Sequence, residues 1–123
     1  MIREKKYDLE DRLIDFTINC SNIVEALPSS KLANHIGGQL TRASASSVLN
    51  YVEAQAGESP ADFIHKLKVV LKEVRECRVC LKIILRKPLL PAKQVQFNID
   101  EANELLEIFL KSIETAQKNR NKK

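Results

Sequence analysis

The sequence predicts an all-α protein, an antiparallel up-down-up-down four-helix bundle that forms a single domain over residues 1–123. Three observations lead to this fold class. Apolar residues recur at alternating steps of three and four along most of the chain, the period of an amphipathic helix. The four prolines stand outside the apolar segments. The segments are separated by about two to six residues, and such short loops make consecutive helices antiparallel.

Composition agrees with a small helical domain. Hydrophobic residues make up 44% and charged residues 29% of the chain, and a domain of this length buries roughly two thirds of its unfolded surface. No run of about 18 apolar residues is present, and residues 3–6 are charged, so we expect a cytoplasmic protein without a membrane span. The odd number of cysteines, Cys20, Cys77 and Cys80, predicts reduced thiols.

The first predicted helix covers residues 8–27. Asp8 is a favourable N-cap, and Pro28 ends the helix. Its apolar stripe consists of Leu9, Leu13, Phe16, Cys20, Ile23, Val24 and Leu27. Ile14 and Ile18 lie off this stripe and form a second apolar flank, which indicates self-association.

The second predicted helix covers residues 30–56, with Ser29 or Ser30 as its cap. Its inward positions are small or polar: Ala33, Ile36, Leu40, Ala43, Ser47, Asn50 or Tyr51, and Ala54. We expect a neighbouring backbone to come close at Gly37 and Gly38, because glycine is otherwise unfavourable in a helix. Gly57 suits the left-handed conformation that often closes helices.

The third and fourth predicted helices cover residues 60–87 and 92–118. Ser59 caps the third helix, Pro60 occupies its first position, and Pro88 and Pro91 end it. The third stripe contains Phe63, Leu67, Val70, Val74, Cys77, Leu81 and Ile84. The fourth contains Val95, Ile99, Ala102, Leu106, Phe109, Ile113 and Ala116. Residues 118–123 form a basic tail.

Several residues of the second and third helices resemble those of a known family. They are Arg42-Ala43, Ser46, Asn50, Glu53, Ser59, Asp62-Phe63 and Glu76. Over roughly residues 8 to 115 the chain resembles the bacterial four helix bundle family, also called the 23S rRNA intervening-sequence protein or S23 family. The resemblance implies a ring-shaped homopentamer, with no enzymatic activity assigned to the family. Some relatives are encoded inside 23S rRNA genes, and similar bundles accompany reverse transcriptases, where a basic surface is thought to meet nucleic acid.

One side of the third helix is basic. The row consists of Lys68, Lys72, Arg75, Lys82 and Arg86, with Arg78 beside it. It is a candidate track for nucleic-acid phosphates. The alternative is pairing with the acidic face of the fourth helix, within the subunit or across an oligomer interface, and the matching length and opposite sign of the two surfaces favour this pairing.

A second basic cluster is expected where the chain ends meet. An even number of antiparallel helices brings both termini to one end of the bundle. The residues concerned are Arg3, Lys5, Lys6, Lys118, Arg120, Lys122 and Lys123. They are a second candidate for polyanion capture, and the alternative is a pair of solubilising tails.

The remaining polar residues favour structure over chemistry. Arg42, Ser46, Asn50 and Glu53 lie along one helix face, and we expect Arg42 to pair with Glu53 or Glu76 in a structural network. Cys77 and Cys80 form a lone C-x-x-C motif, which is a weak signal for a metal or redox site, and we assign Cys77 to core packing because it lies on the apolar stripe. No cofactor is predicted. No metal site is predicted either, because a di-iron bundle needs Glu-x-x-His on two helices, and the sequence offers only Asp62-x-x-His65, whose Asp62 is already explained by helix capping.

These observations predict a cytoplasmic, non-enzymatic homo-oligomer that binds RNA, another nucleic acid or a ribonucleoprotein through basic surfaces. The alternative is a structural or adaptor oligomer whose partner is a protein and whose basic row serves subunit contacts.

Overall fold

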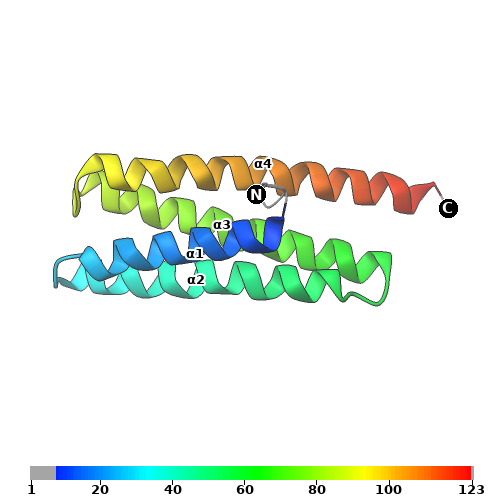
Figure 1. Cartoon of the computed structure of the whole chain (residues 1–123), viewed down its shortest axis with the longest axis horizontal. Coiled ribbons are helices and arrows are strands. Elements are labelled where there is room, and N and C mark those ends of the chain that lie inside the picture. Colours follow the sequence, from blue (N-terminus) through cyan, green and yellow to red (C-terminus); the bar gives the residue numbers. More distant parts are fainter. Residues whose placement is uncertain (1–7, 123) are drawn as a thin grey trace, which may run out of the picture.

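The computed structural model describes residues 8–122, which form four α-helices and no strand (Figure 1). The helices are α1 (Leu9–Ala26), α2 (Lys31–Gln55), α3 (Pro60–Arg86) and α4 (Ala92–Asn121). Consecutive helices run in opposite directions, so the predicted all-α bundle is confirmed. None of the helices in residues 8–122 combines the length and the apolar character needed to cross a lipid bilayer.

The helices form a ring in which chain order is also spatial order. Helix α2 packs on α1 and α3, and α3 packs on α4. The α1–α4 contact, the least extensive of the four, closes the ring. The predicted stripes supply the core, including the fully buried side chains of Phe16, Leu40, Leu81 and Phe109. The apolar period of the sequence therefore encodes the interior correctly.

Side-chain caps begin the first three helices at the predicted residues. Asp8 Oδ1 accepts a hydrogen bond from the backbone nitrogen of Asp11 at 3.3 Å. Ser30 and Ser59 accept equivalent bonds at 3.1 and 3.0 Å. Helix α4 continues to Asn121, so most of the predicted basic tail is helical. Cations in a last turn are favourable next to the helix carbonyl end, which explains this extension.

Gly57 serves a different purpose from the one predicted. No glycine among the described residues has a positive φ, so the expected left-handed conformation is wrong. A Cβ atom at this position would lie 3.0 Å from Asp62 Oδ2 and 3.1 Å from the carbonyl oxygen of Ala54. Glycine is needed here because the start of α3 comes close to the end of α2.

The adjacent glycines of α2 differ from each other. A Cβ on Gly37 would lie 3.2 Å from Val24 Cγ1 and 3.3 Å from Leu27 Cδ1, so close packing against α1 is confirmed there. A Cβ on Gly38 would meet nothing within 4 Å, so the same prediction is wrong for Gly38. The helix period explains the difference, because successive residues point about 100° apart.

Helix α1 is shorter than its neighbours. Its 18 residues extend about 27 Å, whereas the 30 residues of α4 extend about 45 Å. Arg12 in the first turns of α1 lies beside Glu101 and Glu104, near the middle of α4. Consequently, within residues 8–122, one end of the bundle is built by α2, α3 and α4 alone (Figure 1).

Candidate nucleic-acid interface

The predicted basic row is present on the outer side of α3. Lys68, Lys72, Arg75, Lys82 and Arg86 are exposed, and Arg78 is half-buried. The row covers 18 residue steps, which corresponds to about 27 Å of helix. We call these six residues the α3 basic row.

The expected intrasubunit partner of this row is wrong. Arg78 Nη1 donates a hydrogen bond to Asn103 Oδ1 of α4 at 3.0 Å. The other five side chains form no ion pair with any described residue. The row therefore presents five cations to the surroundings of the isolated subunit.

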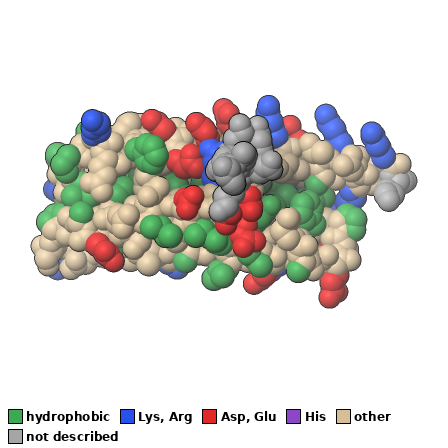
Figure 2. Space-filling view, in the orientation of Figure 1, with side chains coloured by type: hydrophobic (Ala, Val, Ile, Leu, Met, Phe, Trp, Pro, Cys, Tyr) green, Lys and Arg blue, Asp and Glu red, His purple; other side chains and the backbone are tan. Residues whose placement is uncertain are grey.

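Acidic residues of α4 pair with α1 instead. Arg12 Nε lies 2.7 Å from Glu101 Oε2, and Arg12 Nη2 lies 2.6 Å from Glu104 Oε1. These hydrogen bonds raise the pKa of Arg12. Figure 2 shows the acidic side chains gathered over α1 and α4 near mid-length. Sequence reasoning could not make this assignment, because it gives the faces of a helix but not the neighbour that each face meets.

An apolar groove adjoins the α3 basic row on its α2 side. Val79 lies within the row and is 53% exposed. Together with Ile36 of α2 and Ile83 of α3 it lines a depression of about 450 Å³, whose charged lining residues are Lys72, Arg75 and Glu76. The row is therefore a mixed apolar and cationic surface.

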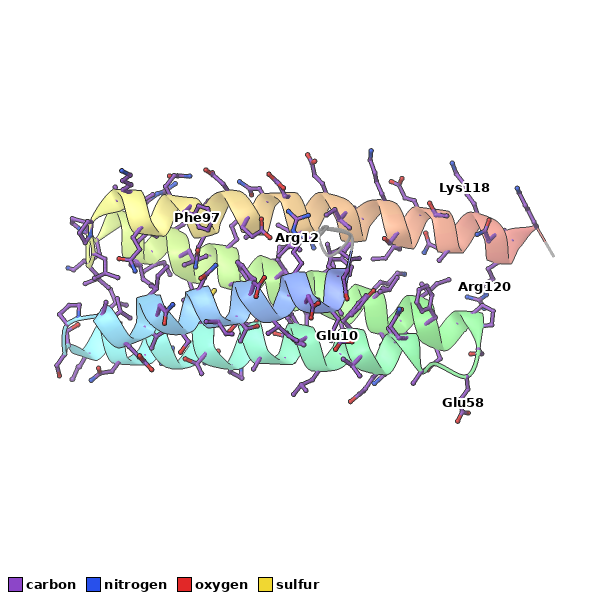
Figure 3. The ribbon with its side chains drawn as sticks, in the orientation of Figure 1. Glu10, Arg12, Glu58, Phe97, Lys118 and Arg120 are labelled. Carbon is purple, nitrogen blue, oxygen red and sulfur yellow. The ribbon has the colours of Figure 1, made fainter. Side chains whose placement is uncertain are left out.

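Only part of the second predicted basic cluster, the part on α4, lies within the described residues. Lys118 and Arg120 are exposed on the last turns of α4, far from Arg12 near the start of α1 (Figure 3). Helix α1 begins beside Glu101 and Glu104, and Lys118 lies 14 residues beyond Glu104, about 21 Å along α4. Arg3, Lys5, Lys6 and Lys123 lie outside the described residues. The meeting of the two chain ends therefore stays a prediction.

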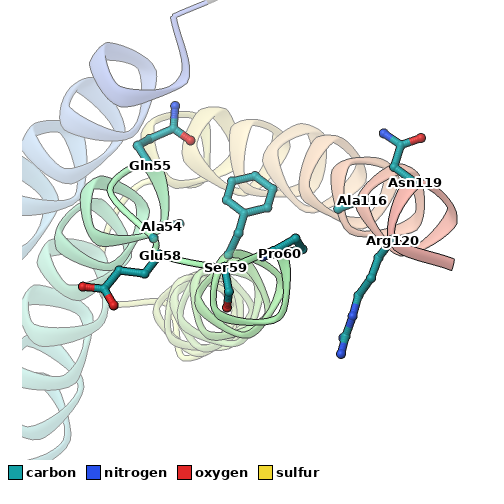
Figure 4. Close-up of a pocket in the computed structure, with 10 residues that line it drawn as sticks. Ala54, Gln55, Glu58, Ser59, Pro60, Ala116, Asn119 and Arg120 are labelled. Atoms are coloured by element: carbon teal, nitrogen blue, oxygen red, sulfur yellow. The ribbon is translucent and has the colours of Figure 1, made fainter. Parts of the chain in front are cut away.

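A cavity of about 510 Å³ opens at the end of the bundle that α1 does not reach. It lies between the end of α2, the α2–α3 loop, the start of α3 and the last turns of α4 (Figure 4). Its lining includes Phe63, Pro60, Gln55, Asn119, Arg120 and Glu58. Sequence reasoning missed this cavity, although the predicted cap at Asp8 already made the first helix shorter than the fourth.

The predicted polar network joins α2 to α3. Arg42 contacts Glu76, as expected, and its Nη1 also lies 3.3 Å from Glu73 Oε1. Ser46 Oγ donates to Glu73 Oε2 at 3.3 Å. Asn50 Nδ2 in turn donates to Ser46 Oγ at 3.0 Å. The nearby Glu73 carboxylate, followed by Glu76, raises the pKa of Arg42.

Two members of the network differ from the prediction. Glu53 binds Lys66, with Nζ 2.6 Å from Oε1, and does not pair with Arg42. Glu73, which was not singled out from the sequence, is the most buried carboxylate in residues 8–122, at 5% exposure. The sequence did carry a signal for its burial, because Glu73 stands next to Val74 on the flank of the α3 stripe. The network connects two helices and satisfies a buried charge, which indicates a structural role.

Cys20 and Cys77 lie in the core as predicted, and Cys80 is buried as well. Cys77 is fully buried and Cys80 is 6% exposed. A hydrogen bond with Cys20 and burial raise the pKa of the Cys77 thiol, so it remains protonated near neutral pH. Within residues 8–122, no group of three or more His, Cys, Asp and Glu side chains is arranged to hold a metal ion.

Comparisons with known proteins agree with this architecture. The model of the 23S rRNA-intervening sequence protein family matches residues 5–111. A crystal structure from Bacteroides thetaiotaomicron is similar, with a TM-score of 0.75 and 25% sequence identity. That protein is described as one of unknown function from the S23 ribosomal protein family, and the match covers 85% of this chain and 96% of that one. No curated protein matches the chain.

Proposed function

Because the chain belongs to the 23S rRNA-intervening sequence protein family, we propose that it is a cytoplasmic, non-enzymatic, homo-oligomeric bundle that binds nucleic acid, RNA in the first place. The observation that supports this function is the α3 basic row. None of its six cations has an ionic partner among the described residues, and the five exposed ones extend along most of the bundle. A linear array of cations suits a linear polyanion.

The size of the row sets the expected salt dependence. If all five cations contact phosphates, the logarithm of the association constant falls with the logarithm of salt concentration at a slope of about −3.5 for a single strand and −4.5 for a duplex. Between 50 and 200 mM salt, this slope corresponds to a loss of affinity of roughly 100- to 500-fold. Side-chain contacts to phosphates carry no base preference, so we expect weak sequence discrimination.

Fluorescence anisotropy with a structured RNA tests the proposal. Replacing Lys72, Arg75 and Lys82 by Gln should reduce the magnitude of the salt slope by about 2 to 3. A matched control replaces Lys31, Lys93 and Lys111, three exposed cations outside the row, and should leave the slope nearly unchanged. Absence of binding at low salt, or equal effects of the two triple variants, would refute the proposal.

The surface of the α1–α2 pair supports self-association. Ile14, Ile18, Leu49 and Val52 are 37%, 53%, 63% and 43% exposed. Thr17 Oγ1 donates to the carbonyl oxygen of Ser44, and this register places Ile14 and Ile18 level with the middle of α2. Figure 2 shows hydrophobic side chains on the surface of these two helices. Contact between copies through this face leaves the opposite α3–α4 side free for nucleic acid.

Light scattering after size-exclusion chromatography tests the assembly. The family resemblance leads us to expect five copies. Replacing Ile18 and Leu49 by Lys should lower the mass, because charged side chains oppose burial of this face. The control is Phe97→Lys, since Phe97 is 64% exposed but lies on α4. A monomeric mass for the unmodified chain would contradict the assembly.

The apolar groove beside Val79 favours a second candidate function, an adaptor that binds a protein. Exposed apolar surface rimmed by polar residues is typical of protein contacts. Affinity purification before and after nuclease treatment separates the two functions. A partner that persists after nuclease treatment and is lost in Val79→Glu would support the adaptor.

A further inference from the structure

The end cavity has the chemistry of a nucleobase site. Phe63, Pro60 and Ala116 form its apolar part, and Gln55 and Asn119 bring amide groups to its edge. Figure 4 shows Gln55 and Asn119 on different sides of the cavity, on α2 and α4. A nucleobase has flat apolar faces and polar edges, and proteins hold unstacked bases between aromatic or apolar side chains with hydrogen bonds at the edge.

Phe63 is suited to stacking because it is held in place and still open to the cavity. The ring is half-buried and packs against the core, while the same side chain lines the cavity. The cavity volume of about 510 Å³ exceeds that of a single base. Helix α1 begins near mid-length of α4 and does not cover this end.

One cation, Arg120, lines the cavity. Lys68, the first member of the α3 basic row, follows Phe63 by five residues, about 7.5 Å along the helix and about 140° around it. A strand that leaves the row at Lys68 would therefore have to cross the start of α3 to reach the cavity, where Arg120 is the next cation. Glu58 is the one carboxylate among the lining residues, and it opposes phosphate binding at this point.

We infer that the end cavity binds one unstacked base of a single-stranded nucleic acid, stacked on Phe63, at the end of the phosphate track formed by the α3 basic row. This inference rests on the proposed nucleic-acid function and adds a preference for single strands, because a base in a duplex is not available for stacking on protein.

A tryptophan at position 63 reports directly on stacking. The chain contains no Trp, so Phe63→Trp introduces a single indole at the cavity. A single-stranded oligouridylate should quench its fluorescence, whereas an RNA duplex of equal length and inorganic polyphosphate should not. Anisotropy is measured on the same samples. Binding of the single strand by anisotropy without quenching would overturn the base site and leave the proposed function intact. Absence of binding to every nucleic acid would overturn the proposed function itself.

Two further variants separate stacking from stability. Phe63→Leu retains apolar contact with the core but lacks the aromatic face, and it should weaken single-strand binding by roughly 5- to 150-fold, the range of one base–aromatic stack. Duplex binding should not change. Thermal unfolding confirms that the variant is folded, and Phe63→Tyr should restore the single-strand preference. Equal loss for both nucleic acids, or no loss for either, would refute the site.

A charge variant tests the rim. Glu58→Gln should strengthen binding of single strands several-fold at low salt and leave the fluorescence response of the Phe63→Trp protein in place. Weaker binding in Glu58→Gln would contradict the position assigned to the strand.

Discussion

The two adjacent glycines of α2 allow a sharp test of the packing of α1 on α2. Alanine is favoured over glycine inside a helix by about 1 kcal/mol. Gly38→Ala should raise the free energy of unfolding by most of this amount, because its Cβ meets nothing within 4 Å. For 123 residues, 1 kcal/mol corresponds to a rise in Tm of about 4 °C. Gly37→Ala brings the same gain, but Val24 and Leu27 must move, since the new Cβ would lie 3.2 and 3.3 Å from them.

Overpacking typically costs about 1–3 kcal/mol, so the net effect of Gly37→Ala should range from roughly zero to a loss of 2 kcal/mol. Urea and thermal unfolding followed by circular dichroism measure both variants at one protein concentration, because association also shifts apparent stability. The double substitution Gly37→Ala with Val24→Ala should recover part of the difference. Equal stabilisation by both single variants would refute the close approach of α1 at Gly37. Destabilisation by Gly38→Ala would show that another surface packs there.

Three further predictions concern charge. Arg42→Met leaves the Glu73 carboxylate, whose side chain is 7% exposed, without its cation. Loss of one partner of a fully buried pair costs about 3–5 kcal/mol. Because Arg42 is half-exposed, we expect urea unfolding to show a loss of roughly 1–2 kcal/mol for Arg42→Met and a smaller loss for Glu73→Gln. Arg12→Gln should cost about 0.5–1 kcal/mol, and the loss should shrink at high salt, because its two ion pairs with α4 are partly exposed. The pKa of the Cys77 thiol is raised in the folded protein, so the native thiol stays protonated, whereas the unfolded thiol ionises near its ordinary pKa of 9.0. The protonated thiol therefore contributes fully to the free energy of unfolding below pH 9, and this contribution is lost as the pH rises above 9. Denaturant titrations from neutral to alkaline pH measure this loss, which should diminish in Cys77→Ala.

The sequence encodes the interior of the bundle strongly. Each step in the α3 stripe from Leu67 to Ile84 returns the side chain to the same helix face, and all of these side chains are buried. Ser59 and Pro60 similarly determine the start of α3, because capping and a fixed φ act locally. Local rules thus predict the elements, their ends and their inward faces.

Properties that depend on two distant segments were predicted less well. The acidic face of α4 is evident from its residues, but whether Glu101 faces α1 or α3 depends on the arrangement of the ring. Gly57 shows a different limit: the atoms that come close to it belong to Ala54, Asp62 and Phe63, and this local sequence is compatible both with a left-handed conformation and with a close approach. The end cavity follows from the unequal lengths of α1 and α4, and no single motif carries that information.

The least extensive contact of the ring joins its first and last helices, and this has a consequence for how the molecule opens. Every other helix contact links neighbours along the chain through a short loop, so it re-forms quickly after a fluctuation. Detachment of α1 breaks its contacts with α2 and α4 and leaves the α2–α3–α4 unit joined. We therefore expect amide hydrogens of α1 to exchange with solvent before those of α3. A detached α1 can also dock on another copy, which makes this helix the natural element for domain swapping.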